Sequence, residues 1–160
     1  MYKILITCLG NICRSPAAEH LILHRLNGHP LEKLIKISSA GLINPGNRAA
    51  GTVRNILEGE MCISSIHEHR SRVASPGMMK ENDLILPMGI YEMKGILHIY
   101  PHENTHTYLD WVYGTNGKEV EDPYGMGRGH YKRMVELLEG TVDDFFQKLE
   151  MILNNVDKNP

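Results

Sequence analysis

Residues 8–15 read Cys-Leu-Gly-Asn-Ile-Cys-Arg-Ser and separate two runs of different character. Residues 3–7, before this stretch, are apolar and predict a buried strand. Residues 16–26, after it, repeat apolar side chains on one helical face and begin with Pro16, which suits a first helical turn. The stretch is therefore predicted to form a tight loop between the C-terminal end of a strand and the N-terminus of a helix.

A loop in this position can bind an anion through its backbone. Unpaired N–H groups and the positive end of the helix dipole converge on it. Gly10 and Asn11 are residue types that tolerate a positive φ angle, so the loop can curl its amides inward. The expected ligand is a phosphate group.

Three side chains of the stretch add chemistry to this phosphate cradle. Cys8 and Arg14 are separated by five residues, and Ser15 follows. N–H dipoles and a guanidinium around a thiol favour its thiolate form, which is the nucleophile. A planar guanidinium can bind two phosphate oxygens at once. An isolated cysteine is usually a small buried hydrophobe, but the complete stretch between strand and helix favours catalysis.

The stretch Cys8–Pro16 matches C-x-G-N-x-C-R-S-P, so the chain resembles the low-molecular-weight protein tyrosine phosphatase family. The resemblance extends over nearly the whole chain. It implies a phosphatase that works through a cysteinyl-phosphate intermediate and needs no cofactor or metal. The phosphate-binding residues that it implies are Leu9, Gly10, Asn11, Ile12, Cys13, Arg14 and Ser15.

Two further segments match landmarks of this family and imply support for the loop. One is Ser39-Ala40-Gly41, in which Ser39 is expected to hydrogen-bond Asn11. The other is His69-Arg70-Ser71-Arg72, in which His69 is expected to join the same network. Such a network would hold the loop in its binding conformation.

The segment Asp122-Pro123-Tyr124 resembles the family's second chemical landmark. The resemblance implies that Asp122 protonates the leaving oxygen and then activates water. Tyr124 and Ile12 are expected to form walls of the substrate cleft. Many relatives carry an acidic residue after the equivalent of Met88, whereas this chain has Gly89, so the role of that carboxylate is expected to be absent.

Four functions fit the loop, and the sequence favours the first. Bulky Ile12 is typical of relatives that act on phosphotyrosine proteins or peptides, whereas relatives that act on phosphoarginine tend to have Thr there. An arsenate reductase would need further resolving cysteines, and only Cys62 lies downstream. The non-enzyme alternative is a phosphate-binding regulatory module. The combination of Cys8, Arg14 and Asp122 speaks against that module.

The second cysteine of the loop suggests redox control. The resemblance implies that oxidants form a reversible disulfide between Cys8 and Cys13, which protects the nucleophile from overoxidation.

Composition limits partners and compartment. The formal net charge of −2 gives no electrostatic case for nucleic acid or membrane binding. No apolar run is long enough to span a bilayer and no signal peptide is evident, so a cytoplasmic protein with free thiols is expected. The sequence predicts no oligomeric state.

Two groups of histidines suggest a metal site, but neither fits one. His67 and His69 flank a glutamate at a spacing that does not match a zinc helix. His98, His102 and His106 recur every four residues, but Pro101 argues against the helix that this spacing needs. No metal is predicted.

Alternating strands and helices predict an α/β fold with a four-stranded parallel sheet and helices on both faces, a three-layer sandwich. The chain is expected to form one domain over residues 1–160, with a frayed tail at 156–160. The predicted strands are residues 3–7, 34–38, 83–88 and 96–100. The predicted helices include residues 16–26, 48–59 and 128–155, and Gly140 is expected to kink or break the last one.

Overall fold

The structure is a computed structural model and describes residues 1–156. The elements in chain order are β1 (Tyr2–Cys8), α1 (Arg14–Leu26), β2 (Ile35–Gly41), α2 (Gly51–Met61), the 3-10 helix η1 (Ser64–Glu68), α3 (Pro76–Lys80), β3 (Leu84–Pro87), α4 (Ile90–Ile99), α5 (Tyr108–Tyr113), α6 (Arg128–Gly140) and α7 (Val142–Val156). None of the described helices combines the length and the apolar character that crossing a membrane requires.

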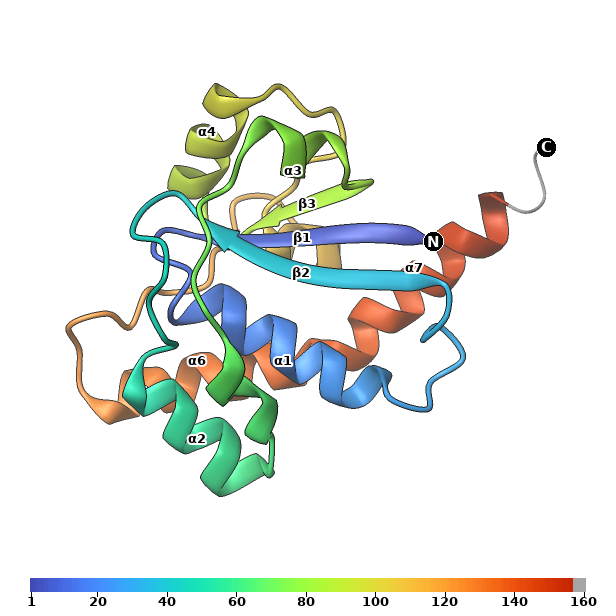
Figure 1. Ribbon diagram of the computed structural model, residues 1–160. Coiled ribbons are helices and arrows are strands. Elements are labelled where there is room, and N and C mark those ends of the chain that lie inside the picture. The colour runs from blue at the N-terminus through green and yellow to red at the C-terminus, as the bar shows by residue number, and fades with distance from the viewer. Residues whose placement is uncertain (157–160) are drawn as a thin grey trace.

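The sheet is parallel, and its strands lie in the order β2-β1-β3. Ile4 of the central strand is in register with Ile37 of β2 and Leu84 of β3. All three strands end at the same edge of the sheet, and the loop that follows β1 lies there (Figure 1). This edge is where ligands bind in open parallel sheets.

The prediction of a fourth strand at residues 96–100 is wrong. Most of these residues form the end of α4, in which Ile96 is buried and His98 is exposed. A short apolar run does not distinguish a strand from a buried helical segment. The chain does reach the free side of β3 a little later, where Thr105 forms a single parallel bridge with Ile85.

Helices cover both faces of the sheet. Helices α1, α2, α6 and α7 lie on one side, and α3 and α4 lie on the other (Figure 1). The side chains of β1 alternate between these faces: Ile4 and Ile6 belong to the larger buried cluster, whereas Leu5 belongs to a smaller one with Ile85 and Ile96. This period of two is what a strand between two apolar layers requires.

The helix predicted over residues 128–155 is two helices, α6 and α7, which are separated at Thr141. The buried Thr141 hydroxyl donates to the Leu138 carbonyl and bonds the Tyr108 hydroxyl, at 2.6 and 2.8 Å. The predicted break near Gly140 is therefore confirmed. The tail predicted to fray lies outside the described residues, apart from the backbone of Val156. Helix α2 begins three residues later than predicted, at Gly51.

Two buried threonines give a matched test of stability. The Thr7 hydroxyl in β1 has no hydrogen-bond partner among the described residues, whereas the Thr141 hydroxyl has two. Because an unsatisfied buried hydroxyl destabilises the folded state, Thr7→Val should raise the free energy of unfolding by about 1–2 kcal/mol, and Thr141→Val should lower it by about 1–3 kcal/mol. Urea denaturation of both variants measures these changes. A lower free energy of unfolding in both variants would contradict the prediction.

His20 attaches α1 to η1. Its Nδ1 lies 2.8 Å from the Ser65 hydroxyl, and its ring packs edge-on against His69 with centroids 6.0 Å apart. Burial, and then the neighbouring His69, lower the pKa of His20 from 6.5 to about 4. Protonation is therefore disfavoured in the folded state but not in the unfolded state.

This difference predicts how stability depends on pH. As the pH falls from 6.5 toward 4, the unfolded chain binds a proton at His20 that the folded chain does not bind, so stability decreases. The full effect of this one group is roughly 3 kcal/mol. His20→Asn keeps a polar partner for Ser65 without titrating, so its unfolding free energy should fall less over this range. If the unfolding free energies of the parent and of His20→Asn fell by the same amount between pH 6.5 and 4, this explanation would be refuted.

Candidate active site

The loop that follows β1 closes around the sulfur of Cys8. The Asn11 N–H and the Ser15 hydroxyl both donate to Cys8 Sγ, at 3.2 and 3.1 Å. The sulfur is buried at the end of β1, close to the N-terminus of α1. Hydrogen bonds and a helix N-terminus both stabilise a negative charge on such an atom. The predicted strand, loop and helix around residues 8–15 are confirmed.

Asn11 holds the loop in its conformation. Its φ of 51° lies in the left-handed region, which an asparagine tolerates better than most residues. Its side-chain amide donates to the hydroxyls of Ser15 and Ser39, at 2.9 and 2.8 Å. The backbone carbonyl oxygen of Asn11 lies 2.8 Å from His69 Nε2. The predicted contacts of Ser39 and His69 with Asn11 are thus present.

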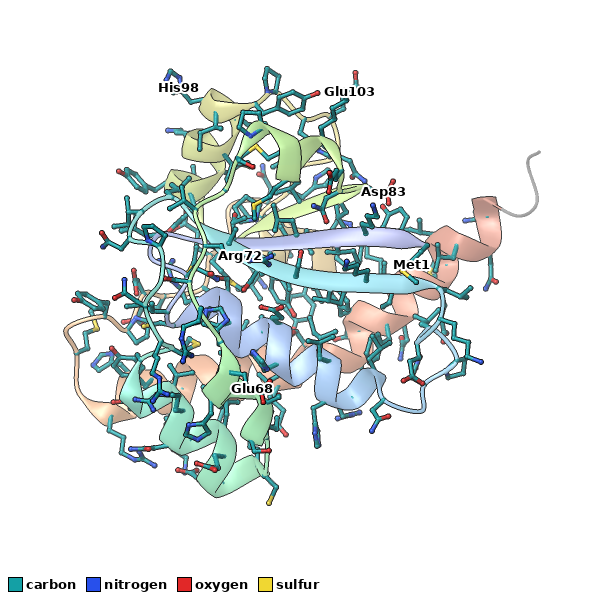
Figure 2. All side chains as sticks on the ribbon, in the orientation of Figure 1. Met1, Glu68, Arg72, Asp83, His98 and Glu103 are labelled. Atoms are coloured by element: carbon teal, nitrogen blue, oxygen red, sulfur yellow. The ribbon has the colours of Figure 1, made fainter. Side chains whose placement is uncertain are left out.

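Arg72, in the segment that follows η1, completes this network, and Figure 2 shows it beside β2. Its backbone N–H donates to Asn11 Oδ1 at 3.0 Å, and its guanidinium donates to the Ser39 carbonyl at 2.8 Å. Every polar group of the buried Asn11 therefore has a partner. The strain of a left-handed residue persists only where its surroundings fix it in this way.

The backbone of β2 approaches the loop so closely that only glycine fits at residue 41. A β-carbon on Gly41 would lie 2.8 Å from the Leu9 carbonyl oxygen and 2.9 Å from the Asn11 nitrogen. The Leu42 N–H donates to the same carbonyl at 2.8 Å. The loop is thereby attached to β2 as well as to β1.

Arg14 lies between two carboxylates. Its Nη2 donates to Asp122 Oδ2 at 2.6 Å and to Glu92 Oε1 at 2.8 Å, and its Nη1 donates to the Val120 carbonyl at 3.4 Å. Its Nε is buried and has no partner among the described residues, so this donor remains for a ligand oxygen. The two carboxylate side chains differ in exposure, at 39% for Asp122 and 6% for Glu92.

Sequence analysis missed Glu92. Residue 89 is a glycine, and the carboxylate that contacts Arg14 from this part of the chain is Glu92, in the first turn of α4. An acidic residue in a first helical turn is common, so the sequence alone carried no signal that it would contact Arg14.

One pocket of about 140 Å³ brings most of the predicted residues together. Its lining residues are Cys8, Leu9, Gly10, Ile12, Cys13, Arg14, Ile43, Asn44, Asp122 and Tyr124. Cys8 and Asp122, which are far apart in sequence, thus face one cavity. Tyr124 is 69% exposed at this pocket, whereas Ser39 and His69 support the loop from outside the lining.

Cys13 has a different environment from Cys8. Its sulfur lies 4.0 Å from the Tyr131 hydroxyl in the core. Burial raises the pKa of the Cys13 thiol to about 12, and the contact with Tyr131 offsets this only in part. Cys13 is therefore a neutral thiol at ordinary pH.

Among the described residues, one group of three side chains comes close enough to suggest a metal site, namely Glu19, His20 and His69. Each of the three already has a hydrogen-bond partner, in Ser39, Ser65 and Asn11 respectively. His98 projects from the outer end of α4, away from the sheet (Figure 2).

Comparison with known proteins places this geometry in a family. Residues 3–155 match the family model described as low molecular weight phosphotyrosine protein phosphatase. The chain is 30% identical over 149 residues to the probable low molecular weight protein-tyrosine-phosphatase AmsI of Erwinia amylovora, covering 92% of this chain and 96% of that protein.

Solved structures agree with this match. A low molecular weight protein tyrosine phosphatase from T. tengcongensis superimposes with a TM-score of 0.83 at 32% identity, covering 92% of this chain and 99% of that one. The YwlE arginine phosphatase from Geobacillus stearothermophilus superimposes with a TM-score of 0.86 at 26% identity, covering 97% of each chain. The chain therefore belongs to the low molecular weight protein tyrosine phosphatase family.

Proposed function

We propose that this protein hydrolyses phosphotyrosine monoesters of proteins or peptides through a cysteinyl-phosphate intermediate. The observation that carries the proposal is that Cys8, Arg14 and Asp122 line the same pocket. A thiol, a guanidinium and a carboxyl group can supply the nucleophile, the phosphate-binding cation and the proton donor that this reaction needs.

In the first half of the reaction, the Cys8 thiolate attacks phosphorus from the side opposite the leaving oxygen. The sulfur–phosphorus bond forms while the bond to the phenolic oxygen breaks. Arg14 and the N–H groups of residues 9–15, apart from that of Asn11, which donates to Cys8 Sγ, bind the other three phosphoryl oxygens. Asp122 gives its proton to the leaving phenolate, so it must first turn from Arg14 toward that oxygen.

In the second half, Asp122 accepts a proton from a water molecule, whose oxygen attacks phosphorus. The sulfur–phosphorus bond breaks, and inorganic phosphate is released. The Ser15 hydroxyl, which donates to Cys8 Sγ, stabilises the departing thiolate. The positive charge comes from Arg14 and the loop, so no step requires a metal ion. We place the reaction in the cytoplasm, where thiols remain reduced.

The walls of the pocket favour an aromatic leaving group. Ile12, Ile43 and Tyr124 present apolar or aromatic surface around the phosphate cradle, which suits the ring of phosphotyrosine. The alternative substrate is phosphoarginine, since the YwlE structure that this chain resembles is described as an arginine phosphatase.

Two substitutions test the assigned roles. Cys8→Ser should abolish hydrolysis of a phosphotyrosine peptide. Asp122→Asn should lower its rate about 100-fold or more, because general acid catalysis typically contributes this much. The loss should be smaller for p-nitrophenyl phosphate, whose leaving group needs little protonation. Full activity of Cys8→Ser would reject the mechanism, and an inactive parent would favour a phosphate-binding regulatory module.

The same assay on paired peptides decides the substrate. We expect a higher kcat/KM for a phosphotyrosine peptide than for a phosphoarginine peptide of the same sequence. The reverse order would assign the arginine phosphatase alternative.

We also propose that Cys13 protects the nucleophile during oxidation. Peroxide converts the Cys8 thiolate to a sulfenic acid. Cys13 then attacks the Cys8 sulfur, so a sulfur–sulfur bond forms and the sulfur–oxygen bond breaks with release of water. Both cysteines line the same pocket. The raised pKa of Cys13 limits its thiolate, so this step should be faster at higher pH.

A Cys13→Ser variant tests this protection. After brief peroxide treatment and then dithiothreitol, the parent should recover most of its activity, and Cys13→Ser should recover much less. Raising the pH during oxidation should improve recovery of the parent alone. Equal recovery in both proteins would disprove a protective role for Cys13.

A further inference from the structure

Glu92 is a carboxylate buried at the active site for which the proposed reaction has no step. Its side chain is 6% exposed, and Arg14 is its one salt-bridge partner among the described residues. Burying a carboxylate is costly unless it is paired, and here the pair is charge-assisted and near the N-terminus of α4. Removing one partner of such a pair leaves the other charge buried alone.

We propose that Glu92 is the positioning residue that holds the Arg14 guanidinium in place while Asp122 leaves it to transfer a proton. This inference rests on the proposed phosphatase function and deepens it. Both carboxylates bond Arg14 Nη2, but only Asp122 is exposed enough to turn toward a substrate. When it turns, the Glu92 contact keeps the guanidinium from following.

The atoms of Arg14 support this division of roles. Nη1 donates to the Val120 carbonyl, and Nη2 is held by Glu92. Nε, which has no partner among the described residues, and the Nη2 N–H that Asp122 leaves are then the donors available to phosphoryl oxygens. A guanidinium fixed at its two terminal nitrogens presents Nε in one orientation, and such preorganisation is what electrostatic catalysis requires.

Gly89 is part of the same arrangement because it leaves room for the Glu92 side chain. A β-carbon at residue 89 would lie 2.8 Å from Glu92 Oε2 and 3.5 Å from the Glu119 carboxylate. The backbone of Gly89 is extended and suits any residue, so its lack of a side chain is what matters. The space that Glu92 Oε2 occupies is therefore within reach of a short acidic side chain at residue 89.

This geometry permits a test by moving the carboxylate. Glu92→Gln should lower kcat for a phosphotyrosine peptide by about tenfold and weaken competitive inhibition by inorganic phosphate, since a misplaced donor affects both. Glu92→Ala should lose at least as much. Adding Gly89→Asp to Glu92→Ala places a carboxylate in the same space, and it should restore a large part of both quantities.

Glu119→Gln is the matched control. Glu119 bonds the N–H of Ile90 at the start of α4, so its loss alters the same helix terminus without touching Arg14. It should lower thermal stability while kcat and phosphate inhibition stay within about twofold of the parent, because only a helix cap is lost.

Three outcomes would overturn the inference. The first is a folded Glu92→Gln variant with unchanged kcat and unchanged inhibition by phosphate. The second is a Glu119→Gln variant that loses as much activity as Glu92→Gln. The third is a Gly89→Asp/Glu92→Ala double variant that regains stability but not kcat. An inactive parent would instead reject the proposed function. In that case the Arg14 Nε–H resonance still tests positioning, since phosphate should shift it in the parent and much less in Glu92→Gln.

Discussion

The active-site loop depends on one buried residue in a left-handed conformation. Asn11 has a φ of 51°, and its backbone and side chain bond to groups from α1, β2 and the segment that follows η1. The same residue donates its N–H to Cys8 Sγ. Because the conformation that curls the loop also directs a donor at the sulfur, loop shape and nucleophile chemistry are set together.

Residues of β2 and of the segment after η1 surround Asn11 and its loop. Ser39 and Gly41 lie at the end of β2, where a side chain at Gly41 would collide with the loop backbone. His69 and Arg72 reach the loop from a segment without regular structure, which η1 and a bridge to β2 keep in place. Each contact is modest, but together they hold the loop in one conformation.

Charge in the site is arranged around Arg14. Two carboxylates offset its charge, and they differ in burial in the way that their proposed roles require. The buried Glu92 suits a fixed partner, and the half-exposed Asp122 suits a group that moves and exchanges a proton. Beyond this charged centre, the apolar and aromatic side chains of Ile12, Ile43 and Tyr124 line the same pocket.

The sequence by itself determined the loop, its flanking strand and helix, and the five-residue spacing between Cys8 and Arg14. Those features are local, since eight consecutive residues carry both the backbone conformation and the chemistry. Family resemblance added Ser39, His69 and Asp122. The strand predicted at residues 96–100 was wrong because a short apolar run fits a strand and a helix equally well, and only packing of Ile96 against the sheet selects the helix. The role of Glu92 could not be predicted from the sequence for a related reason. Its contact with Arg14, 78 residues away in the chain, is created by the docking of α4 on β3, which no local pattern records.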